Sequence, residues 1–336
     1  MRLRAGPKNS ITDVSGVLVG HADDGRLASG VTAIVFEQPT VASVDVRGGG
    51  PGTRETDLLL PERTVQAIDA ICFSGGSAFG LDAASGVMAA LAEAGRGFQV
   101  GSARIPIVPA AILFDLLNGG DKKWGRFPPY RDLGHTAASV ASHDFALGSV
   151  GAGLGARTAN LKGGVGSASS AVEELGVTVG ALAVVNALGS ATVADGRHFW
   201  AAPFELESEF GGIGPAADVS QDAWFPASKP MAGGHTTIAM VATDAALTKT
   251  EARSLAVMAQ NGLARALVPC HTPLDGDVVF AAATGHAELS GERVTALTWL
   301  GHIAALTLSR AVARGVYEAA GTTPGAQPSW KGLFGS

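Results

Sequence analysis

A threonine that follows two glycines and a histidine is the first candidate for chemistry in this sequence. The run Gly233-Gly234-His235-Thr236 gives way to Ile, Val and Thr residues up to Asp244, which is typical of a buried strand. The Thr236 hydroxyl is therefore expected where a loop enters a rigid strand. If the chain is cut before Thr236, the new α-amine, with an ordinary pKa of about 8, can accept the hydroxyl proton and activate a nucleophile. Taken alone, the run is more typical of a plain loop that feeds a core strand.

Two carboxylates flank one glycine in the run Asp275-Gly276-Asp277, directly before an apolar strand. Residues i and i+2 of a strand share a face, so the side chains of Asp275 and Asp277 are predicted to point the same way. Two like charges at that spacing raise one pKa, which suits an acid/base pair or a group that orients an amine. The alternative is a solvated Asp-Gly turn.

An asparagine and a lysine complete the set of candidates. Asn186 ends an apolar strand, where a side-chain amide can donate to an oxyanion, although asparagine is also a common turn residue. Lys162 precedes Gly163-Gly164, where a substrate can approach the backbone and an ammonium can stabilise negative charge. The alternative for Lys162 is a surface side chain beside a turn.

Three familiar motifs are not satisfied. The run Gly151-Ala152-Gly153-Leu154-Gly155 is not the G-x-G-x-x-G of dinucleotide folds, and no serine lies in a G-x-S-x-G elbow. His286-Ala287-Glu288 imitates the H-x-E of zinc deaminases, but no P-C-x-x-C follows it, and the other histidines show no ligand spacing. We therefore expect no cofactor and no metal.

Apolar periodicity predicts the elements that position these residues. Strands are expected over 10–19, 30–36, 40–46, 68–73, 177–185, 236–244 and 277–283. Helices are expected over 81–94, 136–146, 249–261, where Thr248 and Glu251 form a capping box, and 295–319, with a partly helical segment over 106–118. Residues 204–234 are irregular and rich in Pro and Gly, as a linker before a cut would be. Strands and helices come in blocks rather than as βαβ repeats, which favours sheets covered by helices on their outer faces.

Composition limits the functional classes. Of 336 residues, 46% are hydrophobic and 16% charged, which predicts a sizeable core, and the net charge of −6 without a basic cluster argues against a nucleic-acid surface. The first eight residues lack the apolar segment of a signal peptide, and no run of about 18 apolar residues predicts a membrane span. Two cysteines are too few for a disulfide framework, so we expect a reducing cytoplasm.

The motifs taken together resemble the DmpA family of self-processing aminopeptidases and amidases (peptidase family S58), which includes β-peptidyl aminopeptidases and nylon-oligomer hydrolases. The resemblance runs over nearly the whole chain. The matching runs are Asn9 to Val14 with Val17 to His21, Ser74 to Leu81, Val150 to Gly153, Leu161 to Gly164, Thr236 to Asp244, and His271 to Pro273 with Asp275 to Asp277. Each run alone is weak, but their order and spacing are specific.

The resemblance implies a four-layer αββα sandwich, folded as a single domain over 1–336 and cut between His235 and Thr236 into chains 1–235 and 236–336. Thr236 would be the nucleophile and Asn186 the oxyanion residue. Asp275 and Asp277 would position the amine of the nucleophile, and Lys162 is the best match for an active-site lysine. Family members assemble as several αβ units, commonly four.

One departure from the family concerns the residue before the nucleophile, which is usually Asn or Gly and here is His235. We expect this change to keep the nucleophile but to slow the cut or make it depend on imidazole protonation. The leading hypothesis is an amide hydrolase that acts on small peptides or amides from the amino end. The alternatives are an acyltransferase of the ornithine acetyltransferase type, which resembles the same scaffold, and a binding protein whose site has decayed. The walls of the substrate pocket are expected from the loop over 119–131 and the linker over 200–230.

Overall fold

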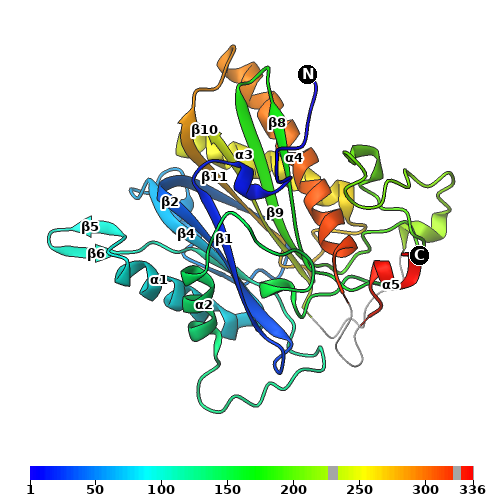
Figure 1. Cartoon of the computed structure of the whole chain (residues 1–336), viewed down its shortest axis with the longest axis horizontal. Coiled ribbons are helices and arrows are strands. Elements are labelled where there is room, and N and C mark those ends of the chain that lie inside the picture. Colours follow the sequence, from blue (N-terminus) through cyan, green and yellow to red (C-terminus); the bar gives the residue numbers. More distant parts are fainter. Residues whose placement is uncertain (226–233, 321–326, 336) are drawn as a thin grey trace.

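The computed structural model describes residues 1–225, 234–320 and 327–335 (Figure 1). Its strands are β1 (Val17–Asp24), β2 (Ser29–Val46), β3 (Thr53–Arg54), β4 (Ala67–Ser74), β5 (Phe98–Val100), β6 (Ala103–Ile105), β7 (Ala110–Ile112), β8 (Val165–Val172), β9 (Val177–Asn186), β10 (Thr236–Ala245) and β11 (Val278–Ala287). Its helices are α1 (Ala83–Glu93), α2 (Tyr130–Ser139), α3 (Lys249–Ala266), α4 (Arg293–Tyr317) and α5 (Trp330–Phe334). Gly233 and the last part of the predicted linker, residues 226–232, lie outside the described residues.

A mixed sheet of nine strands runs through the molecule. Its order is β3-β7-β4-β2-β11-β10-β9-β8, and β1 pairs with β2 off this path. The long strand β2 belongs to both halves, because its first part pairs with β1 and β4 while its second part pairs with β11. Strands β10 and β11 are parallel, whereas β9 and β10 are antiparallel. The start of β10, the end of β9 and the start of β11 therefore meet at one edge of the fold.

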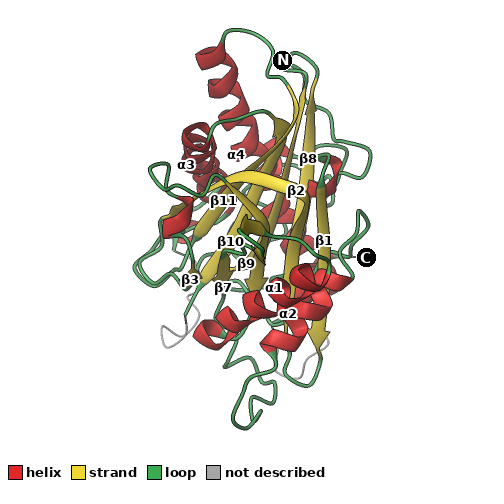
Figure 2. Ribbon diagram, turned by 90° about the vertical axis from the view of Figure 1, so that its left-hand side faces the viewer, coloured by secondary structure: helices red, strands yellow, loops and turns green. Residues whose placement is uncertain are grey.

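Three apolar clusters separate four layers. One lies between helices α1 and α2 and strands β1, β2 and β4, and another lies between strands β8 to β11 and helices α3 and α4. The third joins the inner faces of the two halves of the sheet. Along β10, Ile238 and Met240 belong to the inner cluster while Ala239 and Val241 face the outer helices, as the alternation of a strand requires. These three clusters confirm the predicted αββα order. Figure 2 shows the helices and strands that form the layers.

Three predictions from the sequence are wrong in detail. The strand expected over 10–19 is a short 3-10 helix, Ile11–Asp13, followed by β1, which begins only at Val17 and continues to Asp24. The strands expected over 30–36 and 40–46 are one continuous strand, β2, because the polar residues between them, Glu37 to Pro39, lie exposed where the pairing with β4 shifts register. The segment 106–118 is not helical: it holds the short strand β7, which pairs in parallel with β4. An apolar run of that length fits a buried strand as well as a helix.

The helices follow their predicted positions with shifted ends. Helix α2 begins at Tyr130 rather than near residue 136, and α3 continues past Gly262 to Ala266. Gly262 is needed for packing, because a Cβ there would lie 2.4 Å from the carbonyl oxygen of Ala305 on α4. The capping box of Thr248 and Glu251 is confirmed. Among the described helices, α4 alone is long and apolar enough to cross a membrane, but 72% of that stretch is buried in the fold, as in a core helix.

Candidate active site

Four strand ends converge around Thr236. Thr236 is the first residue of β10 and lies opposite Asn186, the last residue of β9. On the other side, Val278 at the start of β11 pairs with Val46 at the end of β2. The glycine-rich loop after β2 lies directly on the loop before β11, since a Cβ at Gly48 would stand 2.2 Å from the carbonyl oxygen of Asp275. The backbone packing at this edge is thus close enough to require glycine.

The peptide bond between His235 and Thr236 is buried and held from two sides. His235 is only 2% exposed and Thr236 only 4%. The Thr236 hydroxyl donates a hydrogen bond to the carbonyl oxygen of His235. The same oxygen accepts the N–H of Gly276 at 2.7 Å, and His235 forms a parallel bridge with Asp275. A hydroxyl nucleophile and a backbone donor therefore meet at one carbonyl.

Asp277 anchors the residue after the nucleophile. Its Oδ1 accepts the backbone N–H of Thr237 at 2.7 Å. Its Oδ2 accepts both the backbone N–H of His271 and the ring Nδ1 of His271, each at 2.9 Å. Burial lowers the pKa of His271, but its interactions with Asp277 and Cys270 outweigh burial and raise that pKa from 6.5 to about 10. At neutral pH, His271 is therefore an imidazolium paired with Asp277.

Asp275 is held by a matching set of donors. Its Oδ2 accepts the backbone N–H of Thr272 at 2.9 Å and the Thr272 hydroxyl at 2.7 Å, and its Oδ1 accepts the N–H of Leu188 at 3.3 Å. Burial, and then the neighbouring charge of Asp277, raises the pKa of the Asp275 carboxyl against these hydrogen bonds. The raised pKa makes the Asp275 carboxyl more ready to take a proton than an ordinary aspartate.

The side-chain amide of Asn186 has a fixed orientation. Its Oδ1 accepts the backbone N–H of Arg157 at 3.1 Å, and its Nδ2 donates to the carbonyl oxygen of Phe114 at 3.1 Å. The residue is 1% exposed. One of the two N–H groups on Nδ2 is engaged by Phe114, and the other can donate to a negatively charged oxygen. Asn186 is thus a buried, oriented donor rather than an exposed turn residue.

Lys162 is buried, not a surface lysine. Its Nζ donates to the carbonyl oxygens of Leu154 and Ala156, the latter at 3.2 Å, and the residue is 4% exposed. Burial is the main cause that lowers the pKa of Lys162 from 10.5 to about 8; the charge of Asp115 opposes this change and the charge of Arg157 adds to it. Lys162 therefore reaches the site through the loop 154–157, which carries the N–H bonded to Asn186.

Sequence reasoning missed four groups at this site. The residue type of Gly276 does not indicate that its backbone N–H is a hydrogen-bond donor in the site, although a glycine between two aspartates indicates a close approach of the backbone. His271 and Thr272 were read as part of a motif but given no role. Asp115 was also missed, although a single carboxylate in an apolar run is a sign of a buried, hydrogen-bonded group.

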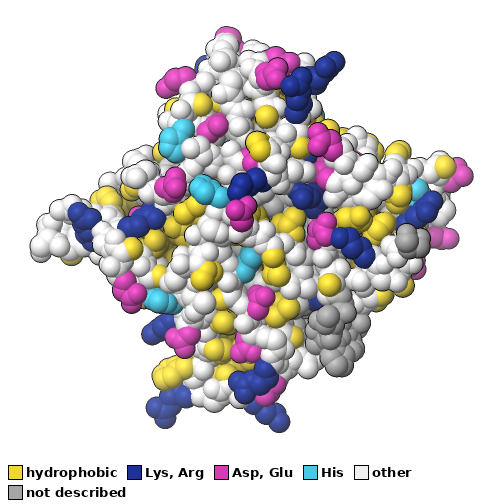
Figure 3. All heavy atoms as spheres, in the orientation of Figure 1, with side chains coloured by type: hydrophobic (Ala, Val, Ile, Leu, Met, Phe, Trp, Pro, Cys, Tyr) yellow, Lys and Arg dark blue, Asp and Glu magenta, His cyan; other side chains and the backbone are white. Residues whose placement is uncertain are grey.

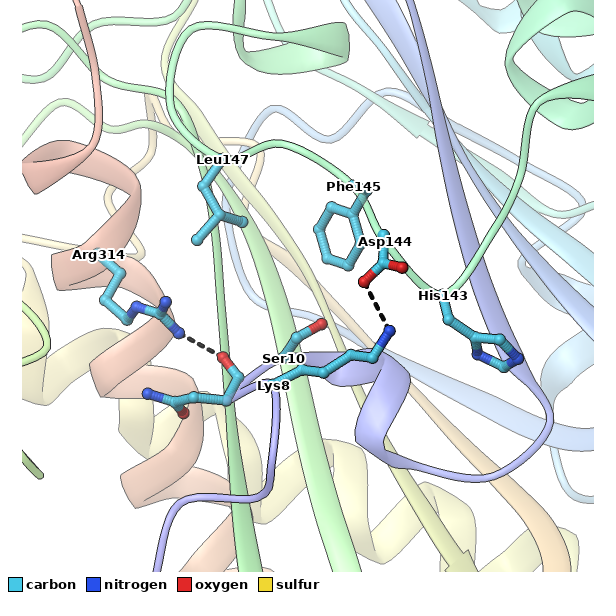
Figure 4. Close-up of a pocket in the computed structure, with 8 residues that line it drawn as sticks. Lys8, Ser10, His143, Asp144, Phe145, Leu147 and Arg314 are labelled. Carbon is cyan, nitrogen blue, oxygen red and sulfur yellow. Dashed lines mark hydrogen bonds and ion pairs between the residues drawn. The ribbon is translucent and has the colours of Figure 1, made fainter.

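A separate cavity of about 210 Å³ contains none of the predicted site residues (Figure 4). It lies between the N-terminal segment, the loop 143–147 and α4, and Lys8 and Asp144 form an ion pair of 2.6 Å in it. The described residues hold no group of three or more His, Cys, Asp or Glu side chains arranged to bind a metal ion. On the face drawn in Figure 3, basic and acidic side chains are interspersed rather than gathered into a basic patch.

Comparisons with known proteins agree on one family. Residues 9–328 match the family model of peptidase family S58. An uncharacterized aminopeptidase of Mycobacterium tuberculosis is 44% identical over 98% of this chain and all of its own length. A 6-aminohexanoate-oligomer endohydrolase of Agromyces is 26% identical over 82% of this chain and 75% of its own.

Solved structures show the same fold. A beta-aminopeptidase of Burkholderia superposes with a TM-score of 0.73 at 23% identity, covering 99% of this chain and 93% of its own. The L-aminopeptidase D-Ala-esterase/amidase of Ochrobactrum anthropi superposes with a TM-score of 0.69 at 22% identity, covering 98% and 92%. The latter is described as a variant of the Ntn-hydrolase fold.

Proposed function

The chain belongs to peptidase family S58, and on that premise we propose that it cuts itself between His235 and Thr236 and then hydrolyses amides with Thr236 as its N-terminal nucleophile. It is an aminopeptidase or amidase of this family; the self-processing and the nature of the substrate are the proposal. The observation that supports it most directly is the convergence of the Thr236 hydroxyl and the Gly276 N–H on the carbonyl of His235.

Self-cleavage follows from that convergence. The Thr236 oxygen attacks the carbonyl carbon of His235, and the carbonyl oxygen becomes an oxyanion beside the Gly276 N–H, 2.7 Å away. The C–N bond then breaks, the nitrogen takes the hydroxyl proton, and an ester joins the two residues. Water hydrolyses the ester, which releases His235 as a carboxylate and leaves Thr236 with a free hydroxyl and a free amine.

Amide hydrolysis uses the amine that the cut creates. The α-amine of Thr236 takes the proton of its own hydroxyl as the oxygen attacks the substrate carbonyl. Asn186 donates its free N–H to the oxyanion, and the leaving amine receives the proton. Water then releases the acyl group and restores the hydroxyl. Asp277 fixes the backbone of Thr237, and Asp275 lies beside the bond that was cut.

The substrate class is proposed as small peptides or amides with a free amino end. Relatives named aminopeptidase and an endohydrolase of 6-aminohexanoate oligomers support an amide bond as the target. An assembly of four αβ units and a cytoplasmic location remain predictions. Light scattering coupled to size-exclusion chromatography tests the assembly.

The decisive experiment is an intact-mass spectrum under denaturing conditions. Wild-type protein should split into residues 1–235 and 236–336, while Thr236→Ala should stay a single chain of 33.8 kDa, the mass of the uncut protein. Thr237→Val is the matched control, because the buried Thr237 hydroxyl has no hydrogen-bond partner among the described residues and its loss should leave the cut intact.

Other results would point elsewhere. A wild-type chain that stays whole and hydrolyses none of a panel of amino-acid amides and dipeptides would favour a decayed site. Transfer of an acetyl group to glutamate without net hydrolysis would favour the acyltransferase. A Thr236→Ala protein that remains fully active would refute Thr236 as the nucleophile.

A further inference from the structure

Two backbone segments decide which end of the Asn186 amide donates. Arg157 presents its N–H to Oδ1, and Phe114 presents its carbonyl oxygen to Nδ2, both at 3.1 Å. If either segment shifts, the amide can rotate or exchange its two ends, and the N–H reserved for the oxyanion is lost. The catalytic value of Asn186 therefore depends on the groups that hold these segments.

Lys162 holds the first segment. Its Nζ donates to Leu154 and Ala156, the residues on the two sides of Gly155. The N–H of Gly163 also donates to the carbonyl oxygen of Ala156 at 3.0 Å. The loop that ends at Arg157 is thus attached to the neighbouring strand region by an ammonium and a backbone bond.

Asp115 lies beside the same glycine and belongs to the second segment. It follows Phe114 directly, it is 3% exposed, and its Oδ1 accepts the N–H of Gly76 at 2.7 Å. A Cβ built on Gly155 would lie 2.8 Å from Asp115 Oδ2, so the carboxyl group touches the backbone there. Burial raises the pKa of Asp115, while the charge of Lys122 opposes that change.

We propose that Asp115 is a positioning residue for Asn186. Lys162 holds the segment that bonds Asn186 Oδ1 through the carbonyls of Leu154 and Ala156. Asp115 belongs to the segment that bonds Asn186 Nδ2, and its carboxyl group lies beside Gly155 of the first segment. Together they fix the amide so that its free N–H faces the substrate carbonyl. This inference rests on the proposed function, because it assigns Asp115 a role in the same oxyanion step.

The test is a double-mutant cycle between Asp115→Asn and Asn186→Ala, read as kcat and KM on chains shown by intact mass to be cut. Asp115→Asn should lower kcat by roughly 10- to 100-fold with KM little changed, since small misplacements of a catalytic group cost that much. In the Asn186→Ala background, Asp115→Asn should lower kcat less than about twofold. Substitutions of residues that act together do not have additive effects on kcat.

A matched control separates positioning from general loss of stability. Asp69 is also 3% exposed and also accepts one backbone N–H, that of Ile107 at 2.9 Å, but it lies in β4 away from Asn186. Asp69→Asn should lower stability and leave kcat unchanged. Asp115→Glu should retain part of the kcat lost in Asp115→Asn, because it keeps a carboxyl group at this position.

The outcomes distinguish the inference from the proposed function. Additive effects of the two changes, or an unchanged kcat in Asp115→Asn, overturn the inference and leave the proposed function intact. An Asn186→Ala enzyme with unchanged kcat overturns the inference and the oxyanion role of Asn186, whereas the role of Thr236 as nucleophile is refuted only by a Thr236→Ala protein that remains active. If Asp115→Asn does not accumulate as folded protein, Asp115→Glu replaces it in the cycle, and additivity with Asn186→Ala then overturns the inference.

Discussion

Replacing Asp277 by Asn should destabilise the fold by about 3 kcal/mol, and the same change at Asp275 by only about 1 kcal/mol. The two residues are equally buried, at 1% exposure each, and lie on the same loop. They differ in their partners, which makes each the control for the other.

The larger cost at Asp277 follows from its donors. An asparagine there can keep its oxygen on the Thr237 N–H, but its NH₂ group then faces the backbone N–H of His271, and the imidazolium loses its counter-ion. A buried donor without an acceptor costs about 1–3 kcal/mol, and a hydrogen bond to a charged group is worth about 1.5–3 kcal/mol. At Asp275 the oxygen can stay on both Thr272 donors, and the NH₂ group meets only the Leu188 N–H at 3.3 Å.

The assay is urea unfolding at a fixed protein concentration, in the uncut Thr236→Ala background so that a single chain unfolds. The pH dependence gives a second, independent readout. The pKa of His271 is raised from 6.5 to about 10 in the folded protein, so its contribution to stability is fully present below about pH 6.5 and is lost as the pH rises through about 10. Asp277→Asn removes the carboxylate that pairs with His271. The difference in the free energy of unfolding between the two proteins should therefore become smaller as the pH rises from about 6.5 to about 10.

Two results would refute this reasoning. Equal costs at Asp275 and Asp277 would mean that the His271 ion pair contributes no more than an ordinary hydrogen bond. A gap between wild type and Asp277→Asn that stays constant from pH 6.5 to pH 10 would mean that His271 does not carry the linked proton.

Three further predictions concern the cut, catalysis and stability. Gly276→Ala should slow self-cleavage at least tenfold in an intact-mass time course, because the new Cβ would lie 2.7 Å from the Thr236 hydroxyl oxygen; an unchanged half-time would contradict the geometry. Asn186→Ala should lower kcat by about 10²–10³ in steady-state amide hydrolysis, as the loss of an oxyanion donor does, and an unchanged kcat would exclude that role. Arg310→Met should cost about 3 kcal/mol in urea unfolding, because it removes the nearer of the two cations that pair with the buried Glu209 carboxylate, 4% exposed, and leaves Arg314 at 4.0 Å; a cost below about 1 kcal/mol would contradict this.

The sequence predicts the site residues at the ends of strands better than those in loops. Thr236 and Asn186 were expected at strand ends from composition alone, and they lie opposite each other in the register of β9 and β10. That register is a tertiary property, so their direct opposition could not be read from either strand. The αββα order was implied by the resemblance to a family, and it is confirmed by three separate apolar clusters.

The prediction is weaker for the site residues that lie in loops. The side chains of Asp275 and Asp277 were expected to share a face because strands alternate, but both residues precede β11. What aligns them is the pair His271 and Thr272, which binds one carboxylate each through consecutive backbone N–H groups. Loop conformations of this kind depend on contacts with segments that are distant in the sequence. The local periodicity of apolar residues does not predict these contacts.

The departure of His235 changes what the Gly276 N–H can do. Before the cut, this donor is bonded to the His235 carbonyl at 2.7 Å, so it is occupied by the bond that is to be broken. After the cut, residue 235 ends in a carboxylate that can leave, and the N–H is free to meet the carbonyl of a substrate that takes the same place beside Thr236. One backbone donor would then serve both reactions, with Asn186 as its partner in the second. On this account Gly276→Ala protein that has finally been cut should still show a lowered kcat, and a normal kcat in that cut fraction would confine Gly276 to self-cleavage.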